Sequence, residues 1–127
     1  MKRLSIYSAL LLLMGFVLSG CYKDVILPDA VVDPDGPPQA VSYKADIAPM
    51  LESKCAKAGC HVSGAHKPYM TSDLSYVQIV NNGYVNTLVP KQSIIYLEIN
   101  GGMKEYIPSA ADRQKVYDWI RTGAQNN

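Results

Sequence analysis

The sequence predicts an all-α fold for a small domain that occupies the C-terminal part of the 127-residue chain. Segments with helical periodicity and helix-capping residues recur along this part, and no convincing run alternates apolar and polar residues as a half-buried strand does. A net charge of +1 does not suit a nucleic-acid binder, and 48% hydrophobic residues do not suit a disordered chain. We therefore expect a folded domain with no nucleic-acid partner.

Residues 1–20 are expected to be a signal peptide. Two basic residues follow the first Met, and the apolar stretch 6–17 is shorter than the roughly 20 residues that span a bilayer. Small residues directly precede Cys21, in a pattern that resembles the lipobox of bacterial lipoproteins, where cleavage leaves the cysteine to be lipidated. An uncleaved membrane anchor with an incidental cysteine is the alternative.

A lipidated Cys21 would attach the protein to a membrane, because several acyl chains on one residue give stable anchoring. In many Gram-negative lipoproteins, an Asp after the cysteine retains the protein at the inner membrane, and Tyr22 stands at that place here. We therefore expect a cell-envelope protein, lipid-anchored at the outer membrane on its periplasmic or surface face.

Residues 21–41 are expected to be the lipidated cysteine followed by a disordered tether. Its composition is dominated by proline and aspartate at positions Asp24, Pro28, Asp29, Asp33, Pro34, Asp35, Pro37 and Pro38. Such stretches stay extended, at about 3.1 Å per residue in the polyproline conformation. The tether would therefore hold a domain roughly 60 Å from the membrane.

The domain itself is expected to cover residues 42–127 and to contain four helical segments. The first segment is expected at 47–54 with Asp46 as its cap, and the second from Ser72 to near Gly83. The third is expected from Ser93 to just before Gly101, and the last helix is expected to be capped by Ser109 and to stop at Gly123. The expected apolar faces are Leu74, Val77 and Val80 in the second segment, and Val116, Trp119 and Ile120 in the last. A domain this small has a marginal core, which a disulfide, metal or cofactor often stabilises.

One heptapeptide carries the candidate chemistry. Residues 55–61 read C-x4-C-H, a wider form of the C-x-x-C-H signature of c-type haem attachment. Both thiols would add to the vinyl groups of a haem, and His61 would be held beneath the iron as its proximal ligand. Small residues around Gly59 would let the extra pair of residues form a tight bulge. Two alternatives remain open, a Cys55–Cys60 disulfide and a zinc site that adds His66 to Cys55, Cys60 and His61.

A haem iron also takes a second axial ligand, for which Met or His serves. Met103 follows two glycines that would let the backbone approach the porphyrin, and it lies just before the last helix. Met70 and His66 are rival candidates, although both are close to His61 in the sequence. Met50 is expected in the core, which is the usual place of a methionine.

The opening of the domain, residues 42–51 followed by Cys55 to His61, and its ending at 109–125 resemble small class I c-type cytochrome domains found in Bacteroidetes-like lipoproteins. The resemblance implies a cytochrome c-like helical domain wrapped around one covalent haem c. It also implies thioether bonds at Cys55 and Cys60 and axial ligation by His61 and Met103. This sequence differs from the pattern in its four-residue Cys spacing and in Lys104, where a proline usually follows the methionine.

The expected function is that of a membrane-anchored monohaem c-type cytochrome, which carries single electrons to and from a redox partner protein. The sequence contains no nucleophile–base pair, carboxylate dyad or phosphate loop, so we expect an electron-transfer protein and not an enzyme. The alternative is a non-haem envelope lipoprotein, with a binding or structural role and a Cys55–Cys60 disulfide. In that case a ligand face would be formed by tyrosines, namely Tyr69, Tyr76, Tyr84 and Tyr96.

Overall fold

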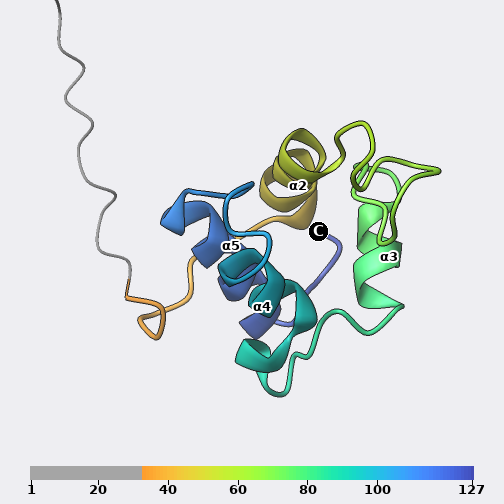
Figure 1. Ribbon diagram of the computed structural model, residues 1–127. Helices are drawn as coiled ribbons and strands as arrows, with labels where there is room; N and C mark the ends of the chain where they lie inside the picture. Colours follow the sequence, from red (N-terminus) through yellow and green to blue (C-terminus); the bar gives the residue numbers. More distant parts are fainter. Residues whose placement is uncertain (1–32) are drawn as a thin grey trace, which may run out of the picture.

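The computed structural model describes residues 33–127. The expected signal peptide, the lipidation site Cys21 and the tether up to residue 32 lie outside the described residues. The described part contains helices and turns but no strand, which confirms the all-α prediction for it. The elements are the π-helix η1 Tyr43–Ile47, α2 Ala48–Cys55, α3 Ser75–Val80, the 3-10 helix η2 Pro90–Gln92, α4 Ile94–Asn100 and α5 Ala110–Arg121 (Figure 1). No helix within 33–127 has the length and apolar character that crossing a membrane requires.

The first helical segment begins earlier than predicted. Its cap is Ser42, whose Oγ accepts the N–H of Ala45 at 3.1 Å. Asp46 lies inside the helical run, and its carboxylate accepts the N–H of Ser42 at 3.0 Å. The prediction that Asp46 is the cap is therefore wrong, because Asp46 instead completes a reciprocal capping pair with Ser42.

The second segment is shorter than predicted and buries a different face. Helix α3 begins at Ser75, and the Ser72 hydroxyl donates to the Glu52 carboxylate on α2 instead of capping α3. Ser75 and Ile79 are buried, whereas Val77 is 52% exposed. The predicted stop near Gly83 is confirmed by the positive φ of +77° at this residue, a conformation that favours glycine.

Helices α4 and α5 follow the prediction closely. Helix α4 starts directly after Ser93 and ends before Gly101. Ser109 caps α5 by accepting the N–H of Asp112 at 3.2 Å, and the left-handed Gly123 ends it. The predicted apolar stripe of α5, which comprises Val116, Trp119 and Ile120, is buried.

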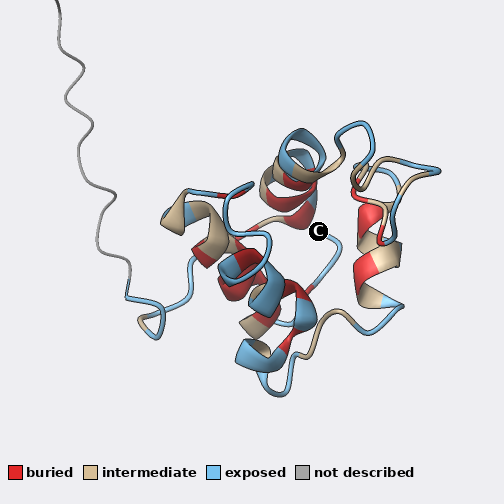
Figure 2. Ribbon diagram, in the orientation of Figure 1, coloured by how far each residue is buried: buried red, intermediate tan, exposed pale blue. Residues whose placement is uncertain are grey.

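Figure 2 shows buried residues on each of the helices α2, α3, α4 and α5. In the core an aromatic cluster joins η1, α3 and α5. The ring of Tyr43 lies 5.0 Å from the rings of both Tyr76 and Trp119, measured between centroids. The Tyr43 hydroxyl donates to the Ser75 Oγ at 2.7 Å, and the Trp119 indole donates to the Gln125 carbonyl at 2.9 Å. The Tyr76 hydroxyl donates to the Ala124 carbonyl at 3.1 Å, so each polar tip in the cluster has a partner, as buried aromatic residues require.

Tyr43 should make the fold sensitive to alkaline pH. Burial raises the pKa of Tyr43 from its ordinary 10.0 to about 12, although the hydrogen bond with Ser75 acts in the opposite direction. Between these values the unfolded chain loses the Tyr43 proton and the folded chain keeps it, so the free energy of unfolding falls as pH rises, by about 3 kcal/mol in total. Urea titrations from pH 9 to 12 should show this decline, and Tyr43→Phe should make it shallower. An equally steep decline in the Phe variant would contradict the assignment.

The last part of the expected tether packs on the helical domain. We call residues 33–41 the N-terminal arm (orange in Figure 1). The backbone N–H of Gln39 donates to the Asp118 carboxylate at 3.0 Å, and the Gln114 side chain donates to the Pro34 carbonyl at 3.2 Å. Val41 is buried in the core. The folded unit therefore begins N-terminal to the expected boundary at residue 42, because α5 offers polar partners to the arm.

Candidate functional site

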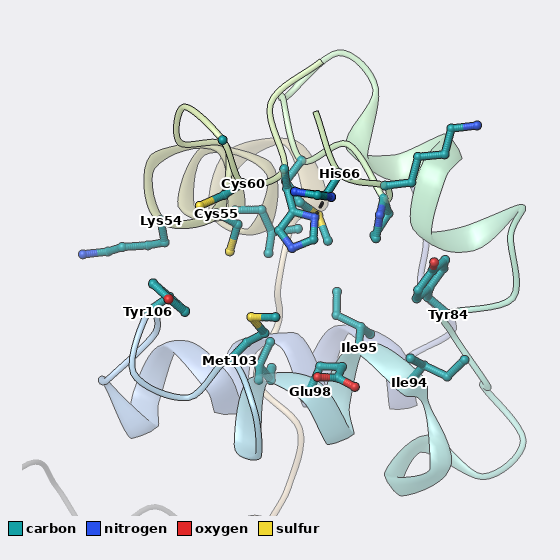
Figure 3. A pocket seen from close by; sticks show the side chains of 17 residues that line it. Lys54, Cys55, Cys60, His66, Tyr84, Ile94, Ile95, Glu98, Met103 and Tyr106 are labelled. Atoms are coloured by element: carbon teal, nitrogen blue, oxygen red, sulfur yellow. Dashed lines mark hydrogen bonds between the residues drawn. The ribbon is translucent and has the colours of Figure 1, made fainter. Parts of the chain in front are cut away.

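A cavity of about 470 Å³ lies between the segment that follows α2 and the segment formed by α4 and the turn after it. Its volume falls within the roughly 300–1,000 Å³ range of cofactor and small-molecule sites. The sequence-predicted residues Cys55, Cys60, His61 and Met103 all line it. Figure 3 shows Cys55 and Cys60 on one wall and Met103 on the opposite wall.

The two thiols are brought to one wall by a tight turn at the end of α2. Cys55 is the last residue of α2, and its carbonyl accepts the N–H of His61 at 3.2 Å. Between them, the N–H of Cys60 donates to the Lys57 carbonyl at 2.9 Å, and Gly59 has a φ of +78°. The expected bulge at Gly59 is therefore present, and a residue with a side chain would be strained there.

Both cysteines are free thiols, so the disulfide of the alternative interpretation is not formed in this structure. Burial raises the pKa of the Cys55 thiol, and the neighbouring Cys60 adds to the effect. Cys55 therefore keeps its proton at neutral pH. The pair presents two uncommitted sulfurs to the cavity.

The imidazole of His61 is oriented by a hydrogen bond to the backbone. Its Nδ1 lies 3.2 Å from the carbonyl oxygen of His66. Because a carbonyl only accepts, Nδ1 carries the hydrogen in this bond, and the lone pair is left on Nε2. This is the arrangement that proteins use to hold a metal-ligating histidine in one tautomer and one ring orientation.

The opposite wall is mainly apolar and belongs to α4 and the turn after it, with Glu98 as its charged member (Figure 3). Ile95 and Ile99 contribute buried side chains, whereas Ile94 is 45% exposed, Met103 38% and Tyr106 48%. These exposed apolar side chains all line the cavity. A cofactor seated in the cavity would cover apolar surface that is otherwise open to water.

Met103 is placed by the turn that ends α4. Its N–H donates to the Glu98 carbonyl at 2.8 Å, and its own carbonyl accepts the N–H of Tyr106 at 3.1 Å. Gly101 and Gly102 do not line the cavity, so the expectation that they make room for a porphyrin is not met. Gly101 is needed for the turn itself, because an added Cβ would lie 2.9 Å from the Leu97 carbonyl oxygen.

The rival ligands come from the same wall as His61. The N–H of Met70 donates to the His61 carbonyl at 2.8 Å, and the Met70 side chain is only 8% exposed. His66 is tied to His61 through its own carbonyl, as described above. Among the Met and His side chains that line the cavity, Met103 is thus the one from the opposite wall (Figure 3). Met50 is packed against the core, as expected.

The donor set suits a haem better than a bare metal ion. Within residues 33–127, no three His, Cys, Asp or Glu side chains are grouped so that they could hold a metal. The four-ligand zinc site of Cys55, Cys60, His61 and His66 is therefore not assembled. A haem supplies its own equatorial nitrogens, so the protein has to supply only the two axial ligands. His61 and Met103 offer one such donor from each wall of the cavity.

Other residues of the cavity gave no signal in the sequence. Glu98, Lys54, Lys67 and Tyr106 line it, and none stands in a recognisable motif. Of the tyrosines in the alternative ligand face, Tyr84 lines the cavity, whereas Tyr76 packs in the aromatic cluster and Tyr96 stacks on Tyr117 at 5.0 Å. The four tyrosines therefore do not all line this cavity, because aromatic packing engages Tyr76 and Tyr96.

Comparison of the chain with protein-family models, with curated proteins and with solved structures finds no match. The functional interpretation therefore depends on the residues and geometry of the cavity.

Proposed function

We propose that this protein is a membrane-anchored monohaem c-type cytochrome that carries single electrons. The observation that supports it best is the meeting of four residues in one cavity. Two free thiols and the oriented His61 line one wall, and Met103 lines the other. The apolar surroundings suit a site in which a redox metal changes its charge with little rearrangement.

In this proposal each residue has a defined task. Cys55 and Cys60 would hold the haem by thioether bonds, formed when each thiol adds across one vinyl group of protohaem and its hydrogen passes to the other vinyl carbon. His61 Nε2 and the Met103 thioether would hold the iron, and a thioether ligand would favour its ferrous state. A bound haem supplies an iron that exchanges one electron between its ferric and ferrous states. Lys54 and Lys67, which also line the cavity, provide positive charge for the haem carboxylates.

The proposal places this electron carrier in the cell envelope. A lipid on Cys21 attaches it to the outer membrane, and the electron passes to or from a redox partner protein. The protein is an electron carrier and not an enzyme, and it has no nucleic-acid partner. Its net charge of +1 is consistent with the last point.

The visible spectrum of the full chain, produced in cells with a cytochrome c maturation system, tests the proposal. We expect a low-spin reduced-minus-oxidised difference spectrum and an intact mass that includes one haem. The variant with both Cys55→Ser and Cys60→Ser should lose the covalent haem. A colourless, folded product whose mass is two hydrogens below that of the free dithiol would contradict the proposal and support a disulfide-containing lipoprotein.

A further inference from the structure

Asp35 of the N-terminal arm contacts two elements next to the α4 wall. One carboxylate oxygen lies 2.7 Å from the Lys91 ammonium on η2, which directly precedes α4. The Tyr117 hydroxyl on α5 donates to the same carboxylate at 3.4 Å. The hydrogen bond from Lys91 holds the pKa of Asp35 below its ordinary 3.8. The carboxylate is therefore charged at neutral pH.

The same two elements fix the position of α4. The ring of Tyr96 on α4 lies 5.0 Å from that of Tyr117, with a 43° angle between the ring planes. Lys91 is three residues before Ile94, the first residue of α4. The other side of α4 forms the cavity wall, and its last turn leads to Met103. Asp35 thus contacts both elements that hold α4, the helix whose other side forms the cavity wall next to Met103.

A buried polar group anchors the rest of the arm. Asp118 is 1% exposed and accepts hydrogen bonds from the Gln39 N–H at 3.0 Å and the Gln114 side chain at 2.8 Å. It also pairs with Arg121 at 2.6 Å. A buried carboxylate needs such partners. The arm therefore supplies a hydrogen-bond donor to a buried side chain of α5.

We propose that the N-terminal arm is a strap that holds α4 against α5, and that Asp35 is a positioning residue for the Met103 wall of the cavity. The part of this inference that concerns the iron rests on the proposed function, whereas the strap itself does not. The arm is the stretch that continues toward Cys21, and none of its residues lines the cavity. It would therefore act on the site through α4. A force or a partner that lifts the arm would loosen Met103.

Amide hydrogen exchange in the full chain tests the strap without any use of haem. Asp35→Asn and Lys91→Gln remove the ion pair, and Gln39→Pro removes the N–H that Asp118 accepts. Asp35→Asn and Lys91→Gln should each speed exchange in residues 94–103 by up to about fivefold, the range of an exposed ion pair. Gln39→Pro should speed exchange in the same residues, and all three variants should leave α3 unchanged. Asp73→Asn is the matched control, because it removes the same charge from an exposed loop residue. Folded arm variants with unchanged exchange in α4 would overturn the strap.

The rate at which imidazole displaces the sixth ligand of the ferric protein tests the positioning role. Asp35→Asn should raise this rate by up to about fivefold, and adding Lys91→Gln should raise it little further. Exchanging the charges by Asp35→Lys with Lys91→Asp should restore the slow rate, which loss of general stability would not explain. Faster α4 exchange with an unchanged displacement rate would overturn the positioning role. A protein without haem would refute the proposed function, and hydrogen exchange would still decide the strap.

Discussion

Replacing His61 by alanine should abolish the low-spin haem spectrum and remove much of the stability of the domain. The imidazole is held by its bond to the His66 carbonyl, so its loss frees both the ligand position and the turn. The haem would stay attached through Cys55 and Cys60, but without its proximal ligand the iron would no longer tie the His61 wall of the cavity to the opposite wall. The free energy of unfolding should therefore fall by about 3 kcal/mol, the upper end of the usual range for one substitution. Visible spectra and urea denaturation of holoprotein measure the two effects together.

His66→Ala is the matched control for this prediction. His66 contributes its backbone carbonyl to the bond with His61, and alanine preserves that carbonyl. The exposed His66 side chain should therefore be removable with little change in spectrum or stability. If His61→Ala kept the normal low-spin spectrum and His66→Ala lost it, His61 would not be the proximal ligand.

The helices were predictable where local signals and tertiary packing agree. Ser109 and Gly123 mark the limits of α5, because caps act within one turn of the chain. Ser93 and Gly101 likewise mark the limits of α4, although the Ser93 hydroxyl does not cap the helix and instead accepts the N–H of Asn86 at 2.8 Å. The face of α3 was not predictable from its periodicity. Ser75 is buried there because the Tyr43 hydroxyl, thirty-two residues earlier, donates to it. Such a contact between distant residues leaves no local pattern.

The candidate site was partly predictable for the same reason. Cys55, Cys60 and His61 stand in one short motif, so their position in one cavity follows from the sequence. Met103 is predictable from its place before the last helix, but the predicted close approach of Gly101 and Gly102 to the cofactor is not found, because neither residue lines the cavity. The glycines turn the chain after α4. The α4 wall and the N-terminal arm depend on packing between elements that no motif encodes.

Replacing Met103 by alanine should open the sixth coordination site and leave the domain folded. The haem should stay bound through Cys55 and Cys60, but the ferric iron should take water or added imidazole. The reduction potential should fall by on the order of 0.1 V, because the thioether that favours ferrous iron is gone. The Met103 side chain is 38% exposed, so its removal leaves no large cavity in the core. Redox titration and imidazole binding measure the change.

Met70→Ala should destabilise the domain and leave the visible spectrum and the reduction potential unchanged. Met70 is 8% exposed and packs in the core, so truncation should cost about 2–5 kcal/mol of stability. It lies on the wall of His61, whose carbonyl it binds through its N–H, and spectrum and potential should therefore stay unchanged. Comparison of the two variants thus distinguishes a methionine that binds the iron from one that packs in the core. If Met70→Ala opened the sixth site while Met103→Ala altered neither spectrum nor potential, Met103 would be a packing residue and its assignment as ligand would be wrong.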